Sequence, residues 1–213
     1  MSVILYGYHY SVYTRIVRMV LAAKDIAYRY VEIDPFSDNP DLAYLDLHPF
    51  GRVPVIRNGD FVLYETAPIA RYLDEISPPV LLSPPDPESR ALMMQMIQIA
   101  DSYGYWPMVR QVFAHRVFRV AEGEEPEENV IAEGKVASRK VCEALDKLAG
   151  DGDFLTGTAI SHADLHLGAM MAYFTLAPEG LEIVNSFPRL QRWWQGMASH
   201  ALLRKTDPGL PLA

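Results

Sequence analysis

A serine lies just ahead of the first predicted helix, in a position that suits an anion. It closes the stretch Gly7-Tyr8-His9-Tyr10-Ser11, and apolar residues at helical spacing begin near Tyr13. The first amides of a helix have no intrahelical partner and form the positive end of its dipole. A thiolate held here by the Ser11 hydroxyl would have a lowered pKa, each unit being worth about 1.4 kcal/mol. A serine before a helix more often only caps it, and this residue alone leaves both interpretations open.

Two further stretches carry groups that could bind a small peptide from two sides, as a clamp. Val53-Pro54 opens a predicted strand, and a proline in this position is often cis, which leaves the backbone groups before it facing outward for an added strand. Glu65 and Thr66 precede a predicted helix that carries Pro68 near its start. The hydroxyl and free amides there suit a carboxylate, and Glu65 suits an ammonium. We therefore expect a site for an amino-acid head group. The alternative is a capped helix beside an ordinary hairpin.

The elements that must position these residues follow from the pattern of the first 80 residues. Apolar runs, helical spacing and a hairpin around Asn58-Gly59 predict the order β-α-β-α-β-β-α. The predicted elements are a strand over Val3–Tyr6, a helix over Tyr13–Ala23, a strand over Tyr28–Ile33, a short helix near Leu42–Leu47, strands over Val53–Arg57 and Phe61–Tyr64, and a helix ending near Ile76.

A domain boundary is predicted directly after this order. Residues 77–87 contain five prolines, which forbid a regular helix and favour a stiff, extended connection. We predict an N-terminal α/β domain over 1–77, a linker over 78–87 and an all-helical domain over 88–213. Its predicted helices cover 88–119 with a kink at Pro107, 127–149, 161–175 and 187–197, and the acidic turn 122–126 is expected to be solvated surface.

The bulk composition excludes several classes of protein. The 213 residues are 50% hydrophobic and 22% charged, which is ordinary for a globular protein, and no apolar run is long enough to cross a membrane. A net charge of -8 without a basic cluster argues against a nucleic-acid partner. The single Cys142 excludes an internal disulfide framework and suits a small buried hydrophobe. We expect a cytoplasmic protein.

A metal site is not expected. His162 and His166 are four residues apart, as metal-binding histidines on helices are. Ala163 stands where a metalloprotease motif needs glutamate, and no third ligand is evident.

Taken together, these stretches resemble the cytosolic glutathione transferases over nearly the whole chain. Residues 11–18 (Ser-Val-Tyr-Thr-Arg-Ile-Val-Arg) are similar to a run of the serine-type classes theta, phi and zeta. Residues 48–54 (His-Pro-Phe-Gly-Arg-Val-Pro) resemble the family's Asn-Pro-x-Gly-Lys-Val-Pro, and Glu65-Thr66 its Glu-Ser pair. The N-terminal half thus looks like a thioredoxin-like glutathione domain, of a bacterial-type member.

The resemblance implies a role for each of these residues. Ser11 would contact the glutathione sulfur, Val53 beside a cis Pro54 would pair with the cysteinyl backbone, and Glu65-Thr66 would hold the γ-glutamyl group. Arg52 would approach the glycyl carboxylate, although His48 and Arg52 replace the family's Asn and Lys. In the C-terminal half, residues 161–165 and 187–193 resemble family structural motifs, and Asp101 occupies the place of an acid that reaches the partner subunit's glutathione.

A tyrosine is the rival for activating the thiol. Tyrosine-type transferases use a phenol at the end of the first strand, which makes Tyr6 or Tyr8 the alternative to Ser11. Counting back from Val17, the tyrosine-type position falls near Gly7, and this favours Ser11. No cysteine lies between Gly7 and Arg18, so we expect little or no thiol-transfer activity.

The function implied is transfer of glutathione, as co-substrate, to a small hydrophobic electrophile by a homodimer active in detoxification. Aromatic and apolar residues near Tyr103–Arg110 would form the electrophile pocket, with Tyr105, Trp106 and Arg110 favoured. The alternatives are a zeta-like glutathione-dependent isomerase and a non-catalytic glutathione-binding or scaffolding protein of the same fold.

Overall fold

The chain forms two compact units in the computed structural model, which describes residues 3–37, 42–79 and 82–211. The first unit comprises residues 1–80 together with 205–208, and the second comprises 81–204 with 209–213. Val80 and Leu81, which belong to the predicted linker, lie outside the described residues.

The first unit is built on a four-stranded sheet with the strand order β2-β1-β3-β4. Strand β1 is parallel to β2 and antiparallel to β3, and β3 is antiparallel to β4. The element order β-α-β-α-β-β-α is confirmed, and with it the thioredoxin-like class of this half. The elements are β1 (Val3–Gly7), α1 (Val12–Ala23), β2 (Tyr28–Glu32), α2 (Leu42–Leu45), β3 (Val55–Asn58), β4 (Phe61–Tyr64) and α3 (Thr66–Ile76).

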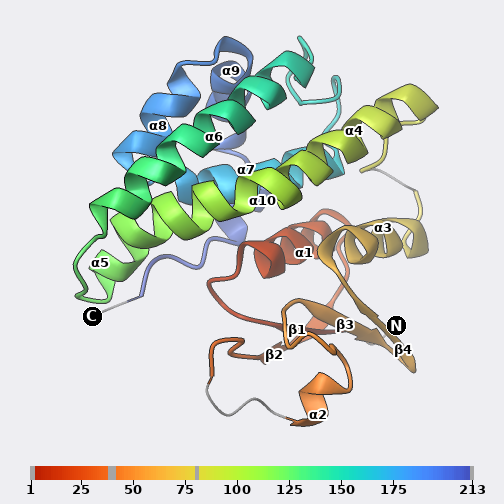
Figure 1. Cartoon of the computed structure of the whole chain (residues 1–213). Coiled ribbons are helices and arrows are strands. Elements are labelled where there is room, and N and C mark those ends of the chain that lie inside the picture. The colour runs from red at the N-terminus through yellow and green to blue at the C-terminus, as the bar shows by residue number, and fades with distance from the viewer. Residues whose placement is uncertain (1–2, 38–41, 80–81, 212–213) are drawn as a thin grey trace. The chain divides into compact units, whose positions relative to one another are not determined.

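Helices α1 and α3 pack beside each other on one face of the sheet, and α2 lies on the opposite side (Figure 1). Their shared core includes Leu5 of β1, Ile56 of β3, Ile16 of α1 and Leu73 of α3, all fully buried. The alternation of buried and half-buried residues along β1 is what the sequence pattern predicts for a sheet covered in this way.

The hairpin differs from its prediction at both ends of β3. The strand starts at Val55, not at Val53, so Val53 and Pro54 form the connection that leads into it. Asn58 pairs with Phe61, which leaves Gly59 and Asp60 as the two loop residues. Gly59 has φ +62°, the backbone conformation that such tight hairpin loops require and that glycine adopts without strain.

The second unit is helical, as predicted. The helices at 128–148, 162–174 and 188–197 match predicted ones, whereas the helices at 178–185 and 201–205 were not predicted. The elements are α4 (Pro87–Ile99), η1 (Ala100–Phe118), α5 (Arg119–Ala121), α6 (Glu128–Leu148), α7 (His162–Phe174), α8 (Pro178–Asn185), α9 (Pro188–Met197) and α10 (Ala201–Lys205).

The segment η1 is the main departure from the predicted helix over 88–119. Its 19 residues are π-helical, with hydrogen bonds to the fifth residue, and Pro107 lies inside this wider coil. Helix α6 packs against it closely at Gly134. A Cβ there would lie 2.8 Å from Gln111 Cβ and 2.9 Å from Val112 Cγ2, so only glycine fits without a shift.

Asp164 joins the two motifs that were predicted in the C-terminal half. Its Oδ2 accepts hydrogen bonds from the backbone nitrogen and the hydroxyl of Ser161, at 2.8 and 2.7 Å, in the predicted capping box. Its Oδ1 accepts from Leu155 N at 2.9 Å and from Trp193 Nε1 of α9 at 2.8 Å. The carboxylate is buried and satisfied by four donors, and it ties α7 to α9.

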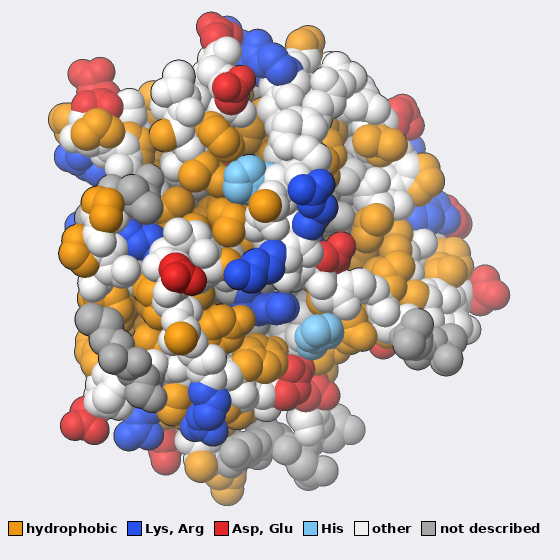
Figure 2. Space-filling view, turned by 180° about the vertical axis from the view of Figure 1, so that it is seen from behind, with side chains coloured by type: hydrophobic (Ala, Val, Ile, Leu, Met, Phe, Trp, Pro, Cys, Tyr) orange, Lys and Arg blue, Asp and Glu red, His pale blue; other side chains and the backbone are white. Residues whose placement is uncertain are grey.

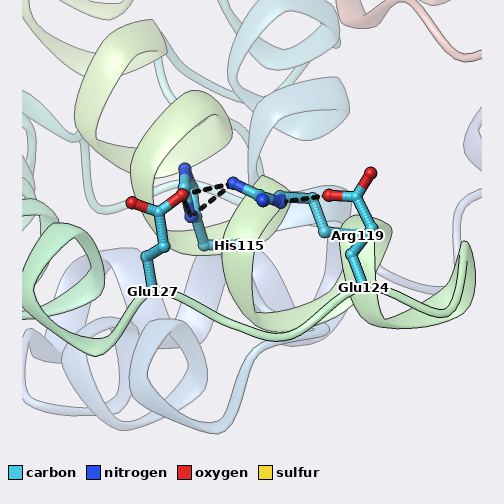
Figure 3. Close-up of polar contacts among 4 residues, drawn as sticks. All are labelled: His115, Arg119, Glu124 and Glu127. Carbon is cyan, nitrogen blue, oxygen red and sulfur yellow. Dashed lines mark hydrogen bonds and ion pairs between the residues drawn. The ribbon is translucent and has the colours of Figure 1, made fainter.

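The acidic turn between α5 and α6 is more than solvated surface (Figure 3). Arg119 Nε donates to Glu124 Oε2 at 2.7 Å, and Arg119 Nη1 donates to Glu127 Oε1 at 2.5 Å. The His115 Nδ1 lies 3.6 Å from the same Glu127 oxygen. These groups are partly exposed, so the network serves to close the turn and contributes little free energy per pair.

Candidate functional site

Ser11 is the N-cap of α1. Its side-chain oxygen accepts a hydrogen bond from the backbone nitrogen of Thr14 at 3.2 Å, and its own backbone nitrogen donates to Tyr8 O at 3.0 Å. A serine hydroxyl can accept and donate at once, so this capping bond uses the oxygen and leaves the O–H to act as donor. The side chain is half-buried. Capping and the binding of an anion are therefore compatible at this residue.

The loop before Ser11 is held by a close packing of Thr14 over Gly7. Thr14 Oγ1 accepts a hydrogen bond from Tyr8 N at 3.3 Å. A Cβ at Gly7 would overlap the Thr14 side chain. Because Gly7 has no Cβ, the chain can turn directly after β1 and pass close to α1. This turn places Ser11 at the edge of the sheet.

The strand register brings the three predicted binding stretches to the same edge of the sheet. Strand β1 ends at Gly7, just before the Ser11 loop. In the antiparallel neighbour, Val55 pairs with Tyr6, so β3 begins at this edge, directly after Pro54. Val55 also pairs with Tyr64, the last residue of β4, which precedes Glu65. Loops that are far apart in the sequence thus emerge side by side.

The connection into β3 is fixed by its backbone and by a tyrosine. The Val53-Pro54 peptide bond is cis, which confirms the prediction. The Tyr44 hydroxyl donates to the Arg52 carbonyl oxygen at 2.6 Å, and burial raises the pKa of Tyr44, so the phenol stays protonated and remains a donor. The Arg52 side chain is exposed, and Val53 is half-buried.

Glu65 and Thr66 form the turn between β4 and α3. Glu65 has φ 72°, an uncommon conformation for a residue with a side chain, and its own side chain is exposed. Its carbonyl oxygen accepts from Ile69 N at 3.0 Å, so the helix is already started by its backbone. Thr66 is the first residue of α3 and is buried. Residues held in such conformations are concentrated at functional sites.

The rival tyrosines make ring contacts within the first unit. The Tyr6 ring lies 6.1 Å from the ring of Tyr44 on α2. The Tyr8 ring lies 5.8 Å from the rings of both Tyr10 and Phe36, edge-on in each case. Both are half-buried, and neither is at a helix N-terminus.

The remaining predicted site residues all lie on η1 in the second unit. Asp101, Tyr105 and Arg110 are half-buried, and Trp106 is 63% exposed. Nine residues span two and a half turns of an α-helix, which would set Asp101 and Arg110 on opposite faces. In the wider π-helix they span about two turns, so Asp101, Tyr105 and Arg110 share one face. Sequence reasoning missed this alignment. Met108 and Val109 are buried in the core.

Of the two helical histidines, His166 has a structural role. His166 Nδ1 donates to the His162 carbonyl oxygen at 3.0 Å, and complete burial lowers the pKa of His166 to about 3. The ring is therefore neutral. Within residues 3–37, 42–79 and 82–211, no group of three or more His, Cys, Asp or Glu side chains could hold a metal ion.

Comparison with known proteins agrees with this arrangement. The family model for the glutathione S-transferase N-terminal domain matches residues 5–84, and that for the C-terminal domain matches residues 128–195. Glutathione S-transferase F13 from Arabidopsis thaliana is 24% identical over 217 residues, covering 100% of this chain and 98% of that protein. Glutathione S-transferase 4 from Zea mays is 27% identical over 215 residues, covering 99% and 94%.

A solved structure is similar over the same extent. The theta class glutathione S-transferase from the citrus canker pathogen Xanthomonas axonopodis pv. citri, with glutathione bound, has a TM-score of 0.80 and 25% identity, covering 96% of each chain. The chain therefore belongs to the glutathione S-transferase family, a family of enzymes. The curated relatives named above are plant proteins of the phi class and give no support to a bacterial-type member.

No helix in the described part of the chain combines the length and apolarity needed to cross a membrane.

Proposed function

We propose that this glutathione S-transferase stabilises the thiolate of bound glutathione at Ser11 and adds the sulfur to a small hydrophobic electrophile. The observation that carries the proposal is the place of Ser11 at the N-cap of α1, with its oxygen occupied by Thr14 N and its O–H available as donor. A hydroxyl donor and the helix dipole both favour the anionic sulfur. Ser11 is therefore a hydrogen-bond donor and takes no covalent part.

The peptide would lie along the sheet edge formed by the three loops. The γ-glutamyl group would bind at Glu65 and Thr66, the ammonium against the Glu65 carboxylate and the carboxylate at the start of α3. The cysteinyl backbone would pair with Val53 beside Pro54, as an added strand pairs with a sheet edge. Arg52, whose side chain is exposed, would approach the glycyl carboxylate. This orientation puts the sulfur toward Ser11.

The reaction then requires two events. The thiol loses its proton to solvent, and the thiolate held by the Ser11 O–H attacks the electrophilic carbon. With an aryl chloride, the new carbon–sulfur bond replaces the carbon–chlorine bond and chloride leaves. The rate gain would come from thiolate stabilisation and from holding both reactants together.

The second substrate would contact the face of η1 that carries Tyr105 and Arg110, with Trp106 beside it. An exposed tryptophan, a tyrosine and a guanidinium on one helix offer an apolar surface with a single cation, which suits a hydrophobic electrophile that develops negative charge. Asp101, on the same face, would reach glutathione bound to the partner subunit. These roles in the second unit are proposals.

We also propose that the protein is a cytoplasmic homodimer. Hydrophobic side chains are exposed over much of the face drawn in Figure 2. In the first unit, the exposed ones include Phe50 at 70% and Phe61 at 47%. Large exposed apolar side chains are common at subunit interfaces. Sedimentation of the wild type and of Phe50→Ser would test the dimer, with a shift toward monomer expected for the variant.

Retention on immobilised glutathione, followed by turnover of chlorodinitrobenzene, tests the activity. We expect retention, elution by free glutathione, and conjugation. Retention without reaction of any electrophile would favour a binding protein, and turnover of a cis-enone diacid without loss of thiol would favour an isomerase. A chain that does not bind glutathione at all would contradict the whole proposal.

A further inference from the structure

We infer that His48 is a positioning residue that joins the two arms of the glutathione clamp and releases them when it takes up a proton. The inference rests on the function proposed above. The first arm is the connection 48–54, which carries Arg52 and Val53, and the second is the turn Tyr64–Thr66. Both arms belong to the first unit.

The His48 ring contacts both arms. Its Nδ1 lies 3.3 Å from the backbone nitrogen of Phe50, two residues further along the first arm. Its ring centroid lies 4.6 Å from that of Tyr64, at an interplanar angle of 32°, and 6.0 Å from that of Phe50. The side chain is only 2% exposed. Tyr64 directly precedes Glu65, so this ring contact links the turn that carries Glu65 to the connection into β3.

The hydrogen bond defines the protonation state in which this contact exists. A backbone N–H only donates, so Nδ1 must be the acceptor, and the imidazole must be the neutral form that carries its proton on Nε2. A protonated ring has N–H donors on both nitrogens. Protonation would therefore remove the bond to Phe50 and bring a buried charge against the Tyr64 ring.

The surroundings favour the neutral ring. Burial lowers the pKa of His48 from its ordinary value of 6.5, and the Arg52 guanidinium lowers it further, while the Glu65 carboxylate opposes both. Tyr44 on α2 stays uncharged beside it, because burial raises the pKa of that phenol. The neutral, clamped state is complete above pH 6.5. It is lost as the pH falls through the lowered pKa of His48.

Two substitutions distinguish the effect of the hydrogen bond from Phe50 N from the effect of the ring contact with Tyr64. His48→Phe keeps an aromatic ring against Tyr64 and removes the acceptor. His48→Asn supplies a side-chain oxygen close to the position of Nδ1 that can accept from Phe50 N and does not titrate. Thermal unfolding of each variant establishes that it is folded.

Binding of S-hexylglutathione, measured by titration calorimetry, is the test. The sulfur of this probe cannot ionise, so Ser11 adds no pH dependence. At about pH 7.5, His48→Phe should bind about tenfold more weakly than wild type, and His48→Asn should restore most of that loss. As the pH is lowered from about 7.5 through the pKa of His48, wild-type affinity should fall severalfold, whereas that of His48→Asn should change by less than about twofold.

Each other outcome contradicts a defined claim. A wild-type protein that binds the probe equally at every pH, or a His48→Phe variant that binds as tightly as wild type, would overturn the role of His48 and leave the proposed function standing. A wild-type protein that does not bind the probe at about pH 7.5 would overturn the proposed function itself.

Discussion

The Ser11 side-chain oxygen lies 3.2 Å from the backbone nitrogen of Thr14 and so accepts one of the first free amides of α1. This contact uses one lone pair of the hydroxyl oxygen and leaves the O–H able to donate, which suits an anionic ligand. The cap and the proposed catalytic role are thus two uses of one hydroxyl.

Removal of this hydroxyl should impair turnover more than binding. Because a hydrogen bond to a charged group is worth about 1.5–3 kcal/mol, Ser11→Ala should lower kcat/KM by about 10- to 100-fold. Ser11→Thr, which keeps the hydroxyl, should retain most activity. Steady-state kinetics with chlorodinitrobenzene measure the effect. If Tyr6→Phe or Tyr8→Phe proved the more damaging change, the serine assignment would be lost.

The close contact between α6 and η1 can be tested by substituting Gly134, which lies at the contact, and Gly196, which does not. Gly134→Ala should lower the free energy of unfolding by about 1–3 kcal/mol, because its Cβ would press on Gln111 and Val112. Gly196 of α9 is the control: it is exposed, and a Cβ there would meet nothing within 4 Å. Gly196→Ala should raise the stability by about 0.5–1 kcal/mol. Denaturant unfolding measures both, and equal effects would contradict the packing argument.

The buried ion pair of the first unit should behave differently when one or both partners are removed. Lys24 Nζ lies 2.9 Å from Asp74 Oδ1 and also donates to the Pro79 carbonyl oxygen, and both charged side chains are almost completely buried. Asp74→Leu should cost about 3–5 kcal/mol, since it leaves the ammonium without its counter-charge. The double variant Lys24→Met/Asp74→Leu should recover most of this stability in the same unfolding experiment. A double variant as unstable as the single one would show that the pair is not coupled.

The buried histidine of α7 should give the stability a pH dependence. The pKa of His166 is lowered by burial from 6.5 to about 3, so between these values the unfolded chain binds a proton that the folded chain does not. Stability is therefore highest above pH 6.5 and falls toward acid by about 1.4 kcal/mol per pH unit from this group. His166→Gln should flatten that slope, and His9→Gln, an exposed control, should leave it unchanged. Equal slopes in the two variants would contradict the assignment.

The parts of the fold that local rules govern were predictable from the sequence. The capping box at Ser161 and Asp164, the cis proline at 54 and the hairpin were predicted because each depends on a few neighbouring residues. The predicted start of β3 was two residues too early, because Pro54 has no backbone N–H to donate to the strand ladder.

Features that depend on packing between distant segments were not predictable. The π-helical course of η1 aligns Asp101, Tyr105 and Arg110, yet nothing in their spacing distinguishes it from an α-helix that would separate them. The acidic turn was expected to be solvated because its partner, Arg119, was not known to face it. The contact of His48 with Tyr64 likewise follows only from the strand register.

The pH titration of bound glutathione, followed by the ultraviolet absorbance of its thiolate, tests the central claim most directly. With wild-type protein the thiolate should form at a pH at least about one unit below that of free glutathione, and Ser11→Ala should shift this titration back toward the free value while glutathione stays bound. A bound thiol that titrates at the same pH in both proteins would contradict the role assigned to Ser11.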